Sequence, residues 1–121
     1  MSSLNLTCYG GVDSVTGANF LLEAEDFKML IDCGLRQGDK FSESENYEAF
    51  AYDPKTIGAL LVTHAHMDHI GRVPKLVKDG FGGVIYSTRE TKLLSEVMFG
   101  DALSLLKREA SERGIGVLYE D

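Results

Sequence analysis

All three histidines of this chain lie within six residues, together with one aspartate, in the segment His64-Ala65-His66-Met67-Asp68-His69. Imidazole nitrogens and carboxylate oxygens are zinc ligands, and a carboxylate beside a metal can also take a proton from water. The spacing predicts that His64 and His66 face one point, while Asp68 and His69 face a second point beside it. Two metals about 3.5–4 Å apart can stabilise both the attacking and the leaving oxygen of a displacement.

Two other interpretations of this cluster remain open. A surface loop can hold histidines without binding a metal, and a structural zinc site usually closes four protein ligands, among them cysteines. Cys8 and Cys33 are far from the cluster in sequence and follow no CxxC spacing. We therefore favour a catalytic metal site and expect both cysteines to be free thiols, as is usual in the cytosol.

The elements around the cluster are predicted to be a strand and a helix. Residues 57–63 form a short apolar run that is typical of a buried strand. Residues 70–78 have apolar side chains at helical spacing, and Pro74 is tolerated only near the first turn of that helix. The metal ligands are therefore expected to line a strand-to-helix loop.

The rest of the chain alternates in the same way, which favours an α/β class. Strands are predicted at residues 4–9, 18–24, 28–31 and 84–87, with those at 18–24 and 28–31 joined as a hairpin. A long polar loop is predicted from residue 36 to residue 48, with one helical turn near residues 47–50. Thr88 is expected to cap a helix that runs to Gly114. One face of that helix is expected to pack on the core through Leu93, Leu94, Val97, Met98, Ala102, Leu105 and Leu106.

Length and charge limit the number of domains and the classes of function that are possible. The chain has 121 residues, enough for one domain, which we assign to residues 1–121. Its 12 Lys and Arg against 19 Asp and Glu give a net charge of −7, which counts against a broad nucleic-acid-binding face. No stretch approaches the roughly 18 apolar residues of a membrane span, and no secretory signal is evident. A cytoplasmic protein without membrane contact is expected.

Beyond the chemistry of its residues, the chain resembles the N-terminal part of metallo-β-lactamase-fold hydrolases, whose HxHxDH signature is matched at residues 64–69. The stretches VTGANFLLE (15–23), LIDCGLRQG (30–38) and GFGGVIYST (80–88) are similar to the β-CASP branch, which contains RNA-processing nucleases. The resemblance implies a four-layer αβ/βα sandwich with two zinc ions at one edge. It also implies a ribonuclease, acting internally or from the 5′ end.

The resemblance implies a role for each site residue. His64 and His66 would hold one zinc, and Asp68 and His69 the other. Asp68 would also lie close to the water that attacks the RNA phosphorus, which makes it the candidate catalytic residue. Asp32 would orient the metal loop without touching the metal. Arg36, in the loop near the mouth of the site, would contact a phosphate.

The family also takes ligands from further along its chain: another histidine, a bridging aspartate and a last histidine. No histidine follows His69 here, and the β-CASP insertion is absent. We therefore expect this chain to be the first portion of a longer enzyme and to be inactive alone. Two other functions stay open: a hydrolase of a small thioester or ester, and a non-catalytic metal-binding module. The oligomeric state is also open, a homodimer of the complete protein being one option.

Overall fold

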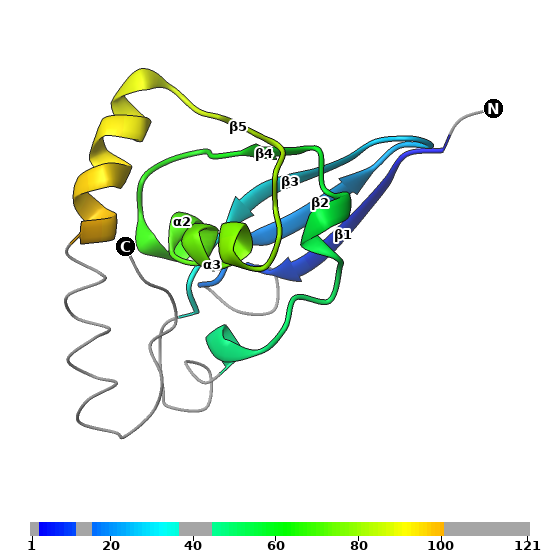
Figure 1. Cartoon of the computed structure of the whole chain (residues 1–121), viewed down its shortest axis with the longest axis horizontal. Helices are drawn as coiled ribbons and strands as arrows, with labels where there is room; N and C mark the ends of the chain where they lie inside the picture. Colours follow the sequence, from blue (N-terminus) through cyan, green and yellow to red (C-terminus); the bar gives the residue numbers. More distant parts are fainter. Residues whose placement is uncertain (1–2, 12–15, 37–44, 101–121) are drawn as a thin grey trace.

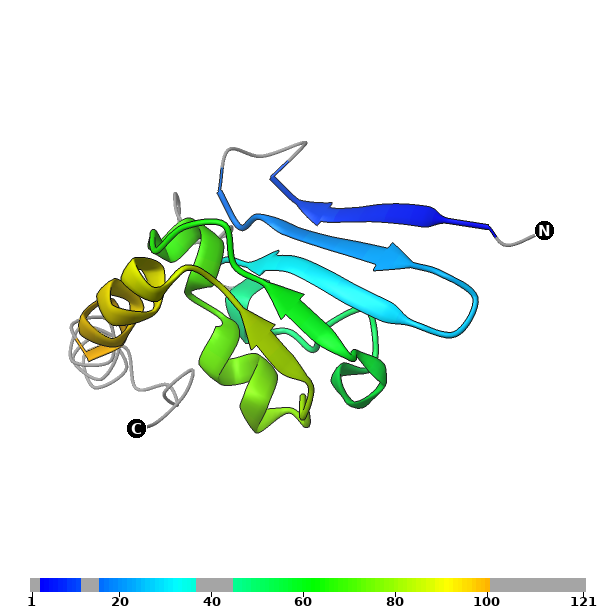
Figure 2. The ribbon, with the colours of Figure 1, turned by 90° about the horizontal axis from the view of Figure 1, so that it is seen from above.

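The computed structural model describes residues 3–11, 16–36 and 45–100 of the chain. Within these residues, five strands form one sheet in the order β1-β2-β3-β4-β5 (Figures 1 and 2). The strands are β1 (Asn5–Gly10), β2 (Asn19–Glu23), β3 (Lys28–Cys33), β4 (Ala59–Leu61) and β5 (Val84–Tyr86). All five lie where the sequence predicts strands, although β4 is shorter than the predicted run.

The sheet is mixed. β1, β2 and β3 are antiparallel neighbours, which confirms the predicted hairpin of β2 and β3. β3, β4 and β5 run parallel, and helical segments lie in both connections between them. Because parallel strands end at the same edge of a sheet, the carboxyl end of β3 lies beside the residues that follow β4. This edge holds the histidines.

The connection from β4 to β5 contains two short helices, α2 (Met67–Ile70) and α3 (Val73–Lys78), on one face of the sheet (Figure 2). The predicted helix over residues 70–78 is confirmed for Val73–Lys78, with Pro74 in its first turn, but it begins three residues later than predicted and a separate helix, α2, precedes it. The chain leaves helical geometry at Arg72, where φ is −103° and ψ is 10°. The Arg72 N–H donates to the Cys33 carbonyl at 2.9 Å instead of continuing α2, and Pro74, which has no N–H, starts the next helix.

The described residues between β3 and β4 include two 3-10 turns. They are η1 (Glu45–Tyr47) and η2 (Pro54–Thr56). The helical turn predicted at residues 47–50 is thus found two residues earlier, at η1. Asp53 caps η2, where its side chain accepts from the Lys55 N–H at 3.1 Å.

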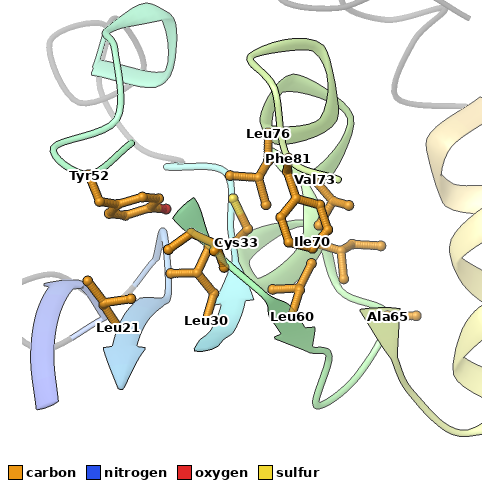
Figure 3. Close-up of a cluster of buried hydrophobic side chains, with 11 residues drawn as sticks. Leu21, Leu30, Cys33, Tyr52, Leu60, Ala65, Ile70, Val73, Leu76 and Phe81 are labelled. Atoms are coloured by element: carbon orange, nitrogen blue, oxygen red, sulfur yellow. The ribbon is translucent and has the colours of Figure 1, made fainter. Parts of the chain in front are cut away.

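The core lies between the sheet and α3 (Figure 3). Leu21, Leu30 and Leu60 are register neighbours on three adjacent strands and are at most 2% exposed. Side chains from the helical layer cover them, among them Ile70, Val73, Leu76 and Phe81. Burial of each such side chain contributes about 1.5–3 kcal/mol, and this packing fixes α2 and α3 against the sheet.

The helix at residues 89–100 corrects a further prediction. Leu93, Leu94 and Val97 were expected in the core, yet they are 54%, 59% and 63% exposed. The side chains turned inward are Ser95, which is buried, and Met98 and Phe99, which pack against the core. Helical spacing predicts an apolar stripe, but the attachment after β5 decides which side meets the sheet. Ala102, Leu105 and Leu106 lie outside the described residues.

The predicted cap of this helix is confirmed, since the Thr88 hydroxyl accepts from the Thr91 N–H at 3.1 Å. Among the described helices, none combines the length and apolar character needed to cross a membrane. From β3 onward, strands alternate with helical segments, which confirms the α/β class.

Candidate metal centre

The histidine loop, residues 64–69, connects β4 to α2 and includes most of α2. His66 is the N-cap of α2, with an extended backbone (φ −89°, ψ 145°). Its carbonyl accepts from the N–H groups of His69 and Ile70 at 2.8 and 3.0 Å. His64 therefore lies before the helix, whereas Asp68 and His69 lie on it. The second half of the expected loop, from residue 67, is thus helical. An acidic side chain in the first turn is favoured by the helix dipole.

Three backbone hydrogen bonds attach α2 and Arg72, which follows it, to the segments beside them. They join the Ala18 N–H to the Asp68 carbonyl (3.0 Å), the Leu35 N–H to the Met67 carbonyl (2.8 Å) and the Arg72 N–H to the Cys33 carbonyl (2.9 Å). Gly34 lies at this contact, and a Cβ there would be 1.7 Å from the Asp68 carbonyl oxygen. Only glycine lets the end of β3 approach α2 so closely.

Asp32 anchors the loop from the end of β3. It is 2% exposed and its φ is 60°, a left-handed conformation that aspartate tolerates better than most residues. Its carboxylate accepts the Thr63 N–H at Oδ1 (2.8 Å), and at Oδ2 it meets the Thr63 hydroxyl (2.7 Å) and Nδ1 of His69 (2.7 Å). Three donors thus satisfy the buried carboxylate. This is the contact that the predicted orienting role of Asp32 requires.

Three of the four predicted ligands come together. His64, Asp68 and His69 each offer one ligand atom, and these atoms lie within 4.8 Å of one another. Nε2 of His69 is 3.5 Å from Oδ2 of Asp68. The ring centroids of His64 and His69 are 3.9 Å apart. The grouping differs from the predicted pairing, because His64 joins Asp68 and His69.

His66 lies beside this group. Its side chain is exposed, and its ring centroid is 4.9 Å from that of His64. The two rings meet edge to face, at an interplanar angle of 79°. His66 therefore remains a predicted ligand on the outer side of His64.

The donor set fits a divalent metal. Because the Asp32 carboxylate accepts the proton on Nδ1, a neutral His69 presents an unprotonated Nε2 to the Asp68 carboxylate, so two acceptors face each other. Two ligands at about 2.0–2.1 Å from one tetrahedral ion stand about 3.4 Å apart. The observed separation of 3.5 Å matches this value. A cation between the two atoms would satisfy both.

Two buried groups behind the site are held in their neutral forms. Burial raises the pKa of the Cys33 thiol to about 12. Burial also raises the pKa of Tyr52, whose hydroxyl donates to Oδ1 of Asn19 at 2.9 Å. The expectation of free thiols is confirmed, with Cys8 exposed and Cys33 buried. At neutral pH, Cys33 is a small hydrophobic side chain and no metal ligand.

Arg36, the predicted phosphate contact, is engaged by protein atoms. Its Nη2 donates to the Tyr9 carbonyl at 2.8 Å. Its backbone N–H and carbonyl are both bonded to the Asn46 side chain, at 2.7 and 2.9 Å. Arg36 lines a pocket with Asn19 and Tyr52, and its role toward phosphate stays a prediction.

Sequence reasoning missed two residues of this centre, Thr63 and Gly34. A signal for Thr63 was available, because a hydroxyl at the end of an apolar run directly precedes the first histidine. Gly34 follows the aspartate at the end of β3, where a close approach could have been suspected. The partner in each contact is distant in sequence, so the contacts themselves needed the fold.

The family described as the Metallo-beta-lactamase superfamily matches residues 14–119. The chain belongs to this superfamily. The match confirms the resemblance read from the HxHxDH signature, and the mixed α/β sheet is in agreement with part of such a domain. The superfamily is metal-dependent, in agreement with the cluster of His64, Asp68 and His69.

Similar proteins carry names from RNA metabolism. The chain is 43% identical over 103 residues to a protein of Thermus thermophilus named a ribonuclease, covering 85% of this chain and 23% of that one. It is 30% identical over 109 residues to transcription termination factor FttA of Methanocaldococcus jannaschii, covering 90% and 17%. It is also 33% identical over 79 residues to cleavage and polyadenylation specificity factor subunit 3-II of Arabidopsis thaliana, covering 61% and 13%.

These relatives confirm the RNA-processing branch that the sequence indicated. The chain spans less than a quarter of the length of each of these relatives.

Proposed function

We propose that this chain is the N-terminal part of a zinc-dependent ribonuclease and that residues 64–69 supply its first metal ligands. The observation that carries the proposal is the cluster of His64, Asp68 and His69, held from behind by Asp32. An imidazole-rich set favours zinc over magnesium or calcium. The names of the relatives support RNA as the substrate. Because the chain spans so little of them, the activity is proposed for the whole protein.

In that protein, two bound zinc ions would supply Lewis acidity and lower the pKa of water, so that attack on phosphorus becomes possible near neutral pH. The residues of this chain have three tasks. His64, His66 and His69 would bind zinc through their ring nitrogens. Asp68 is both a ligand and an acceptor for the proton of the attacking water. Asp32 holds the His69 ring so that Nε2 points at Asp68.

Catalytic zinc usually has three protein ligands, so two ions call for more donors than the loop offers. The further ligands would come from other parts of the whole protein. The isolated chain is therefore expected to bind zinc and to leave RNA intact. We also propose a cytoplasmic location, which the free thiols Cys8 and Cys33 support.

Zinc content after dialysis is the direct test of the metal site. We expect the chain to retain about one zinc ion, by elemental analysis, and the His64→Ala/His66→Ala variant to lose it, since both histidines are predicted ligands. Circular dichroism of the two proteins controls for folding. A chain that folds but retains no zinc would contradict the proposed site.

The substrate is tested in a hybrid protein, in which this chain replaces the matching segment of the Thermus ribonuclease. We expect the hybrid to cleave labelled RNA and a His69→Gln hybrid to be inactive. Hydrolysis of a thioester but not of RNA would favour a small-ester hydrolase. A folded, zinc-loaded hybrid that hydrolyses neither would indicate a non-catalytic metal-binding module.

A further inference from the structure

We infer that Thr63 is a positioning residue that determines which ring nitrogen of His64 is free to bind a metal. Thr63 lies outside the HxHxDH signature and touches the proposed metal only through its neighbours. The inference rests on the proposed metal site, but its first consequence is a property of the metal-free protein.

The Thr63 hydroxyl has two partners and one proton. Oγ1 is 2.7 Å from Oδ2 of Asp32 and 3.0 Å from Nδ1 of His64. An ionised carboxylate can only accept hydrogen bonds, so the hydroxyl proton points to Asp32. Oγ1 then offers a lone pair to His64, and the ring must bring the proton on Nδ1.

The hydroxyl cannot easily turn away from this arrangement. The Thr63 N–H donates to Oδ1 of Asp32 at 2.8 Å, so both the backbone and the side chain of Thr63 are bonded to one carboxylate. Threonine is branched at Cβ, which restricts χ1. Asp32 is 2% exposed, and hydrogen bonds to a buried charged group are stronger than those in water.

The result is a hydrogen-bond chain that fixes two histidines through one carboxylate. His64 Nδ1–H donates to Thr63 Oγ1, and the Thr63 hydroxyl donates to Oδ2 of Asp32. His69 Nδ1–H donates to this same Oδ2. Both rings are thereby left with an unprotonated Nε2. Neutral histidine in water samples both tautomers, so a ring fixed with its proton on Nδ1 is ready to bind without rearrangement.

The test reads the tautomers directly in the metal-free chain labelled with ¹⁵N-histidine. Spectra are recorded near pH 8.5, about two units above the ordinary imidazole pKa of about 6.5. The variants are Thr63→Val, which keeps the shape and removes the hydroxyl, and Thr63→Ser, which keeps the hydroxyl. We expect His64 to carry its proton on Nδ1 in the original chain and in Thr63→Ser, and to show a mixture in Thr63→Val.

His69 is an internal control, because its bond to Asp32 does not pass through Thr63. It should keep its proton on Nδ1 in all three proteins. A proton on Nε2 of His64 in the original chain overturns the inference, and so does an unchanged His64 tautomer in Thr63→Val. If Thr63→Val fails to fold, Thr63→Ala removes the same hydroxyl and takes its place, with the same expected mixture of tautomers at His64.

A second measurement separates this inference from the proposed function. Zinc affinity, by competition with a chelator, should fall about tenfold or more in Thr63→Val, as for other residues that orient ligands, and stay near the original in Thr63→Ser. A tautomer change in a chain that binds no zinc would leave the Thr63–His64 hydrogen bond standing and refute the metal site. Equal zinc affinity in all three proteins would refute the positioning role and keep the metal site.

Discussion

The histidine loop and the segment formed by β5 and the helix at residues 89–100 are held in different ways. The loop is short and polar, yet its backbone is bonded to two separate segments, at Ala18 and at Leu35, and its His69 side chain is bonded to the buried Asp32. β5 is apolar, yet Val84, Ile85 and Tyr86 are 54%, 46% and 54% exposed. An apolar sequence thus predicts that a segment forms a strand or a helix, but not how firmly it is held in the fold. Hydrogen bonds to residues distant in sequence hold a polar segment such as the histidine loop in place.

The largest effect is expected at Gly34, where the end of β3 approaches the histidine loop. In Gly34→Ala the new Cβ would lie 1.7 Å from the Asp68 carbonyl oxygen, so the end of β3 and α2 must separate. We expect a loss of at least about 3 kcal/mol in the free energy of unfolding, the upper end for overpacking. Urea unfolding measures it. Gly82→Ala, where a Cβ meets no atom within 4 Å, is the control and should change little. Equal stability of the two variants would refute the close approach.

Asp32→Asn tests the side-chain half of the loop's attachment. Asparagine tolerates the left-handed backbone, so the change removes mainly the charge and one acceptor oxygen. We expect a cost of about 1–3 kcal/mol from the donors left without a full partner. Zinc affinity should fall about 10–100-fold. Asp26→Asn, at the exposed hairpin tip, is the matched control. Unchanged zinc affinity in Asp32→Asn would contradict the orienting role.

Because the Cys33 thiol is buried beside the loop, we expect the free energy of unfolding to fall at alkaline pH. The pKa of Cys33 rises from 9.0 to about 12 on folding, so the folded state holds this proton more tightly. The stability from the buried neutral thiol is therefore complete below about pH 9 and is lost as the pH rises toward 12. Unfolding free energy measured against pH should fall less steeply in Cys33→Ala. Cys8→Ala, at the exposed cysteine, should follow the original curve.

The smallest effect is expected on the outer face of the helix at residues 89–100. Leu94 is 59% exposed, so Leu94→Ser should change the unfolding free energy by no more than about 0.5 kcal/mol. Leu60→Ala, at a fully buried leucine, should cost about 2–5 kcal/mol in the same assay. A large loss in Leu94→Ser would mean that this leucine is buried in solution, as the sequence predicted.

Much of the fold was predictable, because strands and turns leave local signals. The apolar run at β4 and the hairpin pattern of β2 and β3 indicated the right elements. The break between α2 and α3 was not predictable from spacing, since it depends on the Arg72 N–H finding the Cys33 carbonyl. The exposure of Leu93 and Leu94 was missed for a similar reason: periodicity identifies a face of a helix but does not tell what covers it.

The chemistry of the candidate site is readable from the residue types and their spacing. Three histidines and an aspartate in six residues predict a metal-binding loop, because ligand type and spacing are local properties. Three features follow from the tertiary structure alone. His64 groups with Asp68 and His69, Asp32 is bonded to His69, and Gly34 allows α2 to approach the end of β3. These contacts join residues that are far apart in sequence. They exist because parallel strands end at one edge of the sheet.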